Sequence, residues 1–232
     1  MNIVITIAGA SRRFAVAGID APKWSLPFRG KYVLWEVING LLGISEEKLN
    51  IFLFCLEDQR QLVEKCLTNF QYSSQIYITT TEKITGGQAF SAANCIKSNS
   101  LESESVLIAP GDMIFKNLGK YGLKSSQNWM ALANLPGDNW SFAQLADDGT
   151  VIKTAEKKRI SPFASVGLYH FKSGGQFLEL INHGSPTGGE YYVAPLYNRL
   201  VEIGEKVDSV QISLEDFIDV GTPQAYYENL SD

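Results

Sequence analysis

The first half of the chain alternates between short apolar runs and segments that predict helices. Four apolar runs predict strands, and the first of them is rich in β-branched side chains, which is typical of a strand buried on both faces of a sheet. These runs are residues 2–8, 49–55, 75–79 and 105–109. Helices are predicted between them, over residues 33–42, 58–67 and 89–98. Because strands and helices alternate, we expect a mostly parallel sheet joined by right-handed crossovers.

The second half of the chain has shorter strands and a clear hairpin signal. Strands are predicted over residues 129–135, 140–145, 151–155, 163–171 and 207–212, and helices over 175–182, 193–203 and 223–230. The hairpin turn is the Asp-Asp-Gly-Thr sequence at residues 147–150. No linker, low-complexity segment or repeat divides the chain, so we predict one domain over residues 1–232.

Composition and charge exclude several classes of protein. Apolar side chains make up 45% of the 232 residues, enough for one sizeable core, and no apolar run reaches the ~18 residues of a membrane span. The formal charge of −5 argues against a nucleic-acid partner, since proteins that bind duplexes are normally basic. Residues 1–8 lack a basic start and indicate a strand rather than a signal peptide, so we predict a cytoplasmic protein.

Cysteine and histidine are too few for several common sites. Cys55, Cys66 and Cys95 have no metal-ligand spacing, and their odd number argues against a disulfide framework. We predict reduced, buried thiols. The chain has only two histidines, His170 and His183, which argues against a histidine zinc site or a Ser-His-Asp triad. Chemistry therefore has to depend on carboxylates, lysine, arginine and backbone groups.

The loop after the first strand, residues 9–13, is the first candidate site. Ligands of parallel α/β sheets sit at the carboxyl ends of the strands. Gly9 leaves room at the backbone, and Arg12 and Arg13 add positive charge, so backbone N–H groups and guanidinium groups suit a polyphosphate. The alternative is a tight turn with two solvated arginines.

Three segments of this region together resemble a family signature. Residues 8–14 read Ala-Gly-Ala-Ser-Arg-Arg-Phe, Pro22 and Lys23 follow, and residues 26–31 read Leu-Pro-Phe-Arg-Gly-Lys. They resemble the sugar-1-phosphate nucleotidyltransferases, or nucleotide-sugar pyrophosphorylases. The resemblance implies that Arg13 and Lys23 contact the nucleoside triphosphate or the departing pyrophosphate. The nucleotide-binding loop is then Gly9, Ala10, Ser11 and Arg12.

Within that loop, two residues depart from the family. Ser11 stands where the family prefers glycine, and Arg12 where it prefers threonine or serine. A side chain at position 11 is expected to narrow the phosphate cradle.

Two further segments resemble the nucleotide and metal sites of the family. Residues 85–90, Thr-Gly-Gly-Gln-Ala-Phe, are similar to its base-recognition segment, which implies nucleotide binding by Gly86, Gly87 and Gln88. An ordinary helix start is the alternative. Residues 109–115 resemble the Gly-Asp-Asn-Ile-Phe motif of the glucose-1-phosphate thymidylyltransferases, so Gly111 would lie at the nucleotide and Asp112 would be catalytic and hold Mg²⁺. The alternative for Asp112 is a turn residue at a strand end.

The second half carries the implied acceptor site. Residues 141–157 resemble a strand–turn–strand of the family, where Glu156 would contact sugar hydroxyls and Lys157 the sugar phosphate. Lys158 replaces a family proline, so the sequence leaves open which lysine reaches the phosphate. The resemblance also implies that Gly167 and Glu190 contact the sugar. The alternatives are a solvated charged edge and, for Glu190, a carboxylate at a helix start.

Residues 217–223, Phe-Ile-Asp-Val-Gly-Thr-Pro, resemble a thymidylyltransferase motif whose aspartate is the second metal ligand. Asp219 would then hold Mg²⁺ together with Asp112. The alternative is that Asp219 caps the helix that starts near Thr222 and Pro223.

Taken together, these motifs follow family order over nearly the whole chain and resemble the small capsule-type enzymes of the family. They imply a three-layer α/β/α nucleotidyltransferase domain, Rossmann-like and GT-A-type, with a mixed, mainly parallel sheet. Residues 1–112 would bind nucleotide and residues 113–232 the sugar phosphate. The implied reaction joins a nucleoside triphosphate and a sugar-1-phosphate with Mg²⁺, in surface-polysaccharide synthesis. The thymidylyltransferase-like motifs favour a pyrimidine triphosphate as the donor substrate, and transfer of a guanylyl group remains open.

Two other functions remain open at this stage. A nucleotide-sugar-dependent glycosyltransferase of related fold usually carries an Asp-x-Asp motif, but residues 111–114 read Gly-Asp-Met-Ile. A non-catalytic domain that binds nucleotide or sugar phosphate is kept open by Ser11, Arg12 and Lys158.

Overall fold

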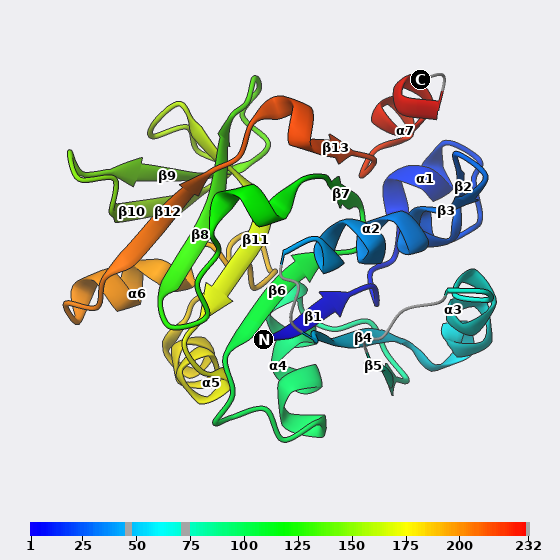
Figure 1. The fold of residues 1–232 in the computed structure, drawn as a ribbon, viewed down its shortest axis with the longest axis horizontal. Coiled ribbons are helices and arrows are strands. Elements are labelled where there is room, and N and C mark those ends of the chain that lie inside the picture. Colours follow the sequence, from blue (N-terminus) through cyan, green and yellow to red (C-terminus); the bar gives the residue numbers. More distant parts are fainter. Residues whose placement is uncertain (45–47, 71–74, 231–232) are drawn as a thin grey trace.

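The computed structural model describes residues 1–44, 48–70 and 75–230. Within these ranges, nine strands form one central sheet (Figure 1). The strands are β1 (Asn2–Thr6), β4 (Asn50–Leu56), β5 (Gln75–Thr81), β6 (Val106–Pro110), β8 (Asn128–Asn134), β9 (Ser141–Leu145), β10 (Val151–Glu156), β11 (Phe163–Phe171) and β12 (Val207–Gln211). Their order across the sheet is β10-β9-β11-β6-β1-β4-β5, with β8 paired to β11 and β12 paired to β8.

Strand directions make this sheet mixed but mainly parallel. β1 is parallel to β4 and β6, β4 is parallel to β5, and β12 is parallel to β8. β11 is antiparallel to β6, β8 and β9, and β10 is antiparallel to β9. β10 and β11 therefore run against the other strands of the sheet. The predicted mixed, mainly parallel sheet is confirmed.

Helices cover both faces of the sheet, as the alternation of side chains in β1 shows. Ile3 and Ile5 pack in one apolar cluster with α2 (Val33–Leu42), whereas Val4 packs in a second cluster with α4 (Gln88–Ser98). Successive side chains of a strand point to opposite faces, so the two clusters lie on opposite sides of the sheet. The predicted α/β/α layering is confirmed (Figure 1).

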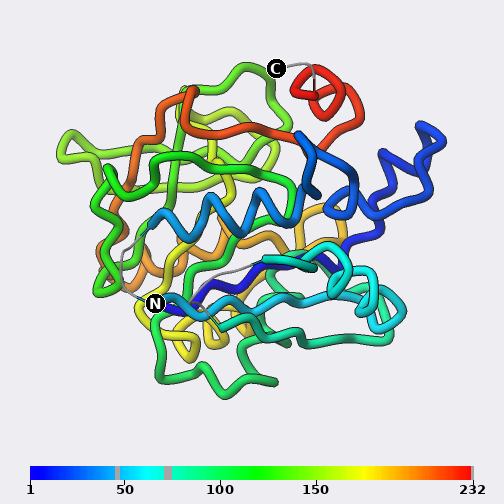
Figure 2. The backbone as a smooth tube through the Cα atoms, turned by 45° about the vertical axis from the view of Figure 1, so that its right-hand side comes forward, coloured from blue at the N-terminus to red at the C-terminus, as the bar shows by residue number. Residues whose placement is uncertain are grey.

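The remaining helices contribute buried residues to one cluster or the other. α1 (Arg12–Val16), α3 (Arg60–Cys66) and α7 (Pro223–Leu230) join the cluster of α2, and α5 (Gly174–His183) and α6 (Leu196–Glu202) join that of α4. α7 lies beside the N-terminal hairpin of β2 (Pro27–Phe28) and β3 (Lys31–Tyr32), where Tyr226 donates a hydrogen bond to the Pro27 carbonyl (Figure 2). The last helix therefore braces the loops that follow β1.

Helix boundaries differ from the predictions where turn chemistry intervenes. The helices over residues 33–42 and 223–230 have the predicted bounds. The helix predicted to start at residue 193 starts at Leu196, because Pro195 takes the N-cap position, where its missing N–H donor costs nothing. The helix predicted over 58–67 opens with a 3₁₀ turn, η2 (Glu57–Gln59), before α3.

Several short elements were not predicted at all. β2, β3, β7 (Met113–Phe115), β13 (Phe217–Asp219) and α1 are all five residues long or shorter. Segments of this length show no hydrophobic period, so only their partners in the fold reveal them. Two of them, β7 and β13, pair with each other at the candidate site.

All three cysteines are free and buried, which confirms the predicted thiols. Burial raises the pKa of the Cys55 and Cys66 thiols to about 11 and that of Cys95 to about 12, so the nucleophilic thiolate is suppressed. Among the residues that the structure describes, no helix is both long and apolar enough to cross a membrane.

Candidate active site

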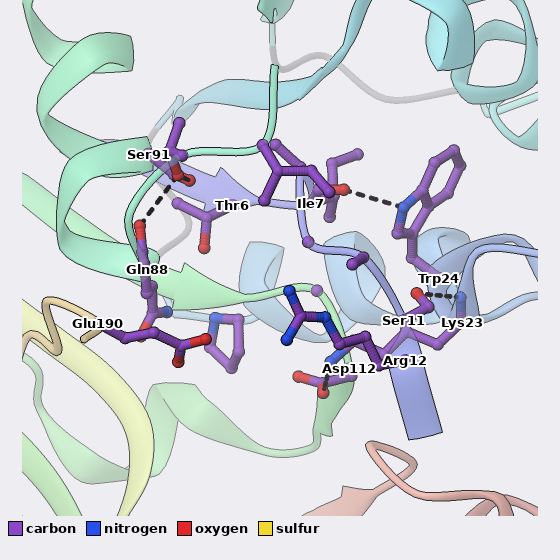
Figure 3. A pocket seen from close by; sticks show the side chains of 18 residues that line it. Thr6, Ile7, Ser11, Arg12, Lys23, Trp24, Gln88, Ser91, Asp112 and Glu190 are labelled. Carbon is purple, nitrogen blue, oxygen red and sulfur yellow. Dashed lines mark hydrogen bonds and ion pairs between the residues drawn. The ribbon is translucent and has the colours of Figure 1, made fainter. Parts of the chain in front are cut away.

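A cavity of about 370 Å³ opens where the carboxyl ends of β1 and β6 meet the start of α4 (Figure 3). It is lined by most of the residues predicted to bind nucleotide, which come from the loop after β1, the start of α4 and the turn after β6. Those residues are Gly9, Ala10, Ser11, Arg12, Lys23, Gly87, Gln88, Gly111 and Asp112, joined by Glu190 from the predicted acceptor set. Gly86 lies next to the cavity but does not line it.

The Ser11 side chain is turned toward the backbone of Lys23, at the start of the 3₁₀ turn η1 (Lys23–Ser25). Its hydroxyl accepts a hydrogen bond from the Lys23 backbone N–H at 3.1 Å. Ser11 has φ of +47°, the left-handed region that favours glycine and costs a side chain about 1 kcal/mol. Ser11 thus has the backbone conformation that glycine favours. Its hydroxyl also links the loop to Lys23, whose ammonium lies in the cavity.

Positive and negative charges meet inside this cavity. The Lys23 ammonium forms an ion pair with the Asp112 carboxylate, and the Arg12 guanidinium points into the same space (Figure 3). Among the described residues, no hydrogen bond or ion pair joins Arg12 to a partner. Arg12 is therefore available to an anionic ligand, whereas Lys23 already compensates the charge of Asp112.

A second cavity, of about 550 Å³, lies on the other side of Asp112. Arg13, Gly167 and Asp219 line it, together with Trp140, and Pro110 and Asp112 belong to both cavities. Successive residues of a helix point about 100° apart, so Arg12 and Arg13 at the start of α1 face different cavities. Asp112 stands at the junction.

Asp219 reaches this junction through a two-stranded ribbon. β13 pairs with β7, which places Asp219 opposite Met113, and the Val220 N–H donates to the Asp112 carbonyl at 3.0 Å. Burial raises the pKa of Asp219, and the charge of Asp112 raises it further, whereas the Gly221 N–H, Lys23 and Arg13 lower it. Asp219 does not cap the next helix, because the Thr222 hydroxyl accepts from the Ala225 N–H at 3.1 Å.

The two aspartates approach each other around Gly221, and the Asp112 oxygen that faces this point is the one paired with Lys23. A Cβ atom built on Gly221 would lie 2.7 Å from Asp112 Oδ2 and 3.0 Å from Asp219 Oδ1, so these two oxygens are at most 5.7 Å apart. Within the described residues, no group of three or more His, Cys, Asp or Glu side chains forms a metal cluster. Two carboxylates with phosphate and water as further ligands are a donor set that suits Mg²⁺.

Gly87 is required by its contact with the segment that carries Glu190. Its φ is +122°, and a Cβ atom there would lie 2.6 Å from the Tyr191 carbonyl oxygen. The Tyr191 N–H donates to the Gly86 carbonyl at 2.8 Å, and the Tyr191 carbonyl accepts from the Ala89 N–H at 3.1 Å. These contacts bring Glu190 to the nucleotide-side cavity. The alternative that Glu190 starts a helix is wrong, because α6 begins at Leu196.

Gly167 lies at an irregularity of β11, where the pairing with β8 shifts between Ser165 and Tyr169. Its φ is +87°, a Cβ atom would lie 2.8 Å from Pro110 Cγ, and its N–H donates to the Ser165 hydroxyl at 3.0 Å. Bulges of this kind are frequent beside active sites. Gly167 is thus required by local packing, and it also lines the second cavity.

Glu156 and Lys157 lie at the end of β10. The Ser141 hydroxyl donates to Glu156, and burial raises the pKa of the Glu156 carboxyl. The Lys157 ammonium donates to the Tyr192 hydroxyl at 2.7 Å, and Tyr192 donates in turn to Glu190 at 2.9 Å. Neither Glu156 nor Lys157 lines the two cavities described above.

Sequence reasoning missed two aromatic side chains of this region, Tyr192 and Trp140. Tyr192 follows Glu190 by two residues, so the predicted carboxylate was the only nearby signal. Trp140 starts a predicted strand and was interpreted as part of it. Their places at the site depend on chain segments that meet only in the folded protein.

Comparison with known proteins bears on the type of enzyme. No protein-family model and no curated protein matches the sequence. Among solved structures, the chain is similar over 100% of both chains to a nucleoside-diphosphate-sugar pyrophosphorylase from Vibrio cholerae RC9, with 28% identity and a TM-score of 0.85.

Two more distant structures share the fold. An inositol-1-phosphate CTP transferase from T. maritima is 18% identical with a TM-score of 0.78, covering 99% of this chain and 94% of that one. A protein assigned as a glucose-1-phosphate thymidylyltransferase from Bacillus anthracis is 17% identical with a TM-score of 0.80, covering 100% and 94%. The Vibrio cholerae match confirms the predicted resemblance and supports an enzyme of the pyrophosphorylase type, whereas the two more distant matches show the fold alone.

Proposed function

We propose that this protein, similar as it is to nucleotidyltransferases of this kind, transfers a nucleotidyl group from a nucleoside triphosphate to a sugar-1-phosphate and releases pyrophosphate. The observation that carries the proposal is the junction at Asp112. One cavity there combines a phosphate-binding type of loop with Gly87 and Gln88 at the start of α4, and the adjoining cavity holds Arg13 and Asp219. Two phosphorylated substrates that react with each other need two such adjoining spaces.

In this proposal the nucleoside triphosphate occupies the cavity of Figure 3. Its phosphates lie against the loop of residues 9–12, where Arg12 and Lys23 supply positive charge. Its base lies at the start of α4, where Gly87 and Gln88 line the cavity and Gln88 offers a side-chain amide. The Lys23 ammonium pairs with Asp112 in this structure, so it has to move to the phosphates or share its N–H donors with them.

The sugar-1-phosphate occupies the adjoining side, with Gly167 close to the sugar. Glu156 and Glu190 accept hydrogen bonds from sugar hydroxyls, and Lys157 holds the phosphate. Lys157 and Glu190 already share Tyr192 as a partner. The sugar would therefore span from the end of β10 to the segment that contacts the start of α4.

The reaction is an in-line displacement. An oxygen of the sugar phosphate attacks the α-phosphorus, the new P–O bond forms, and the bond from the α-phosphorus to the bridging oxygen breaks, so pyrophosphate leaves with that electron pair. The attacking oxygen is already ionised at neutral pH, and no side chain has to remove a proton. The residues act by positioning and charge. Lys23, in the triphosphate cavity, neutralises the departing pyrophosphate, Arg13, in the adjoining cavity beside Asp219, adds positive charge where the phosphates react, and Lys157 holds the acceptor.

Asp112 and Asp219 are the residues that would hold Mg²⁺. When bound, the ion would supply a positive charge that neutralises phosphate oxygens. The convergence of the two carboxylate oxygens around Gly221 supports this assignment. Burial raises the pKa of Asp219 and the charge of Asp112 adds to this effect, so a cation between the two carboxylates would relieve their repulsion.

The donor substrate is proposed from the sequence motifs. The motifs around Asp112 and Asp219 resemble those of thymidylyltransferases and favour a pyrimidine triphosphate. We place the activity in nucleotide-sugar supply for surface polysaccharides, in the cytoplasm, where triphosphates are available.

The test is pyrophosphate release with and without Mg²⁺, across CTP, UTP, dTTP, GTP and ATP, against a panel of sugar-1-phosphates. Release that depends on one triphosphate, one acceptor and Mg²⁺ supports the proposal and names both substrates. No release from any pair, combined with a triphosphate-induced rise in Tm, contradicts transfer and favours a domain that only binds nucleotide.

A further inference from the structure

Three side chains from two distant segments form one hydrogen-bonded chain. Lys157 follows β10, and Glu190 and Tyr192 belong to the segment before α6. The Lys157 ammonium donates to the Tyr192 hydroxyl at 2.7 Å and lies 4.8 Å from the centre of the Tyr192 ring. The same hydroxyl donates to Glu190 Oε2 at 2.9 Å. Tyr192 is therefore the link between a cation and a carboxylate that have no direct contact.

The backbone at Lys157 is held in an unusual conformation. Lys157 has φ of +51°, in the left-handed region that side chains rarely adopt, and its N–H donates to the Trp140 carbonyl at 2.9 Å. Such a conformation costs about 1–3 kcal/mol and persists where the surroundings impose it. The direction of the Lys157 side chain thus follows from a specific turn at the end of β10.

Lys158 has no comparable support. Among the described residues, no hydrogen bond or ion pair holds its ammonium, whereas Lys157, which is exposed like Lys158, has the Tyr192 hydroxyl as a partner. Of the two lysines that the sequence leaves open for the acceptor phosphate, only Lys157 is oriented. Its ammonium has three N–H donors and gives one to Tyr192, which leaves two for phosphate oxygens.

The charges around Lys157 explain why a neutral partner matters. Glu156 and Glu190 both act on the Lys157 ammonium and raise its pKa, after the larger effect of the Tyr192 hydrogen bond. Without that hydroxyl, the ammonium is free to turn to either carboxylate. An ion pair between Lys157 and one of these carboxylates would neutralise the positive charge that binds the acceptor phosphate.

We propose that Tyr192 is a positioning residue of the acceptor site, which holds Lys157 toward the acceptor phosphate and keeps it from pairing directly with Glu190. This inference rests on the proposed function, since it assigns a role within that same site. Tyr192 acts through Lys157, so its effect belongs to acceptor binding. Among the described residues, no hydrogen bond joins Tyr192 to Arg12, Lys23 or Gln88, although its partner Glu190 lines the triphosphate cavity.

The experiment compares wild-type protein with Y192F, K157M, K158M and the double variant Y192F/K157M. Initial rates of pyrophosphate release give separate KM values for the acceptor and the triphosphate that the substrate panel identifies. Y227F is the matched control, because Tyr227 is an exposed tyrosine on α7 at 56% exposure, outside both cavities.

We expect Y192F to raise the acceptor KM about tenfold, the effect of one hydrogen bond to a charged group, and to change the triphosphate KM less than about twofold. K158M and Y227F keep wild-type constants. The double variant is no worse than K157M, because Tyr192 has no role once the ammonium is absent.

Three results overturn the inference, and they can be told apart. An active wild type whose acceptor KM is unchanged in Y192F removes the role of Tyr192 and leaves the proposed function intact. Equal losses in both KM values with a lower Tm would show a merely structural role. A wild type that releases no pyrophosphate from any pair contradicts the proposed function, and the role of Tyr192 with it.

Discussion

At the scale of single residues, Asp112 has the most demanding position. Its carboxylate borders both cavities, pairs with Lys23 and lies near Asp219. Its backbone is confined as well, since a Cβ atom on the preceding Gly111 would lie 2.3 Å from Ile7. A substitution that keeps the shape of Asp112 and removes its charge therefore tests charge alone.

We expect Asp112→Asn to lower kcat by about 10² or more, the scale of losing one preorganised charge contact, without a large change in Tm. Initial rates of pyrophosphate release measure the effect. Asp147→Asn, in the exposed hairpin turn, is the matched control and keeps wild-type turnover. A wild-type rate in Asp112→Asn would contradict the assignment of this carboxylate.

The two neighbouring arginines are expected to separate kinetically. Arg12 lines the cavity proposed for the triphosphate, whereas Arg13 lines the one that holds Asp219. Arg12→Ala should therefore raise the triphosphate KM about tenfold and leave the acceptor KM unchanged. Arg13→Ala should lower kcat by about 10². Identical kinetic defects in the two variants would show that the two cavities do not divide the substrates.

At the scale of elements, the β7–β13 ribbon brings Asp219 to Asp112, and Asp216 anchors the start of that ribbon. The Asp216 side chain is buried at 1% exposure and accepts hydrogen bonds from Asn117 at 2.9 Å, from Tyr121 and from Lys120 at 2.6 Å. These donors lower the pKa of Asp216 to about 2, with Lys120 the largest cause. The charged form of Asp216 is therefore the one that the fold stabilises.

The stabilising effect of Asp216 depends on pH in a defined direction. Its pKa in the folded protein, about 2, lies below the unfolded value near 3.9, so the stabilisation is complete above about pH 4 and is lost as the pH falls toward 2. Asp216→Asn should lower the free energy of unfolding at neutral pH and remove this acid-range slope. Urea unfolding between pH 2 and pH 7 measures both, and an unchanged slope in the variant would refute the assignment.

At the scale of the whole molecule, His170 connects β11 to the segment before β8 in the packed interior. It is fully buried, stacks on Trp129 with 5.3 Å between ring centres, and its Nδ1 hydrogen-bonds with the Gln127 carbonyl at 2.6 Å. Burial lowers the pKa of His170 to about 4. The interior therefore keeps this ring neutral at physiological pH.

Acid should consequently destabilise the whole fold. The unfolded chain binds a proton at His170 near pH 6.5 and the folded chain only near pH 4, so the free energy of unfolding falls over this interval, by up to about 3 kcal/mol. His170→Gln should be less stable at pH 7 and lose this slope, whereas His183→Gln, on the exposed end of α5, keeps it. Unfolding curves between pH 4 and pH 7 measure the free energy of unfolding. A wild-type protein whose free energy of unfolding does not change with pH in this range would contradict the prediction.

Much of the fold was predictable because it depends on neighbours along the chain. The alternation of Ile3, Val4 and Ile5 predicts a strand covered on both faces, and the spacing of Val33, Val37 and Leu41 predicts the buried face of α2. The family resemblance likewise implied that Lys23, Gln88 and Asp112 share one site, and the structure brings them together in the cavity at the carboxyl ends of β1 and β6.

The sequence by itself determined which residue types the site contains and which strands carry them. Only the tertiary structure decided that Arg12 and Arg13 face different cavities, that Asp219 meets Asp112 through a three-residue strand, and that Tyr192 joins Lys157 to Glu190. The physical reason is the distance along the chain over which each effect acts. Periodicity and turn chemistry act over a few residues, whereas these contacts join segments whose separation is set by how the whole core packs.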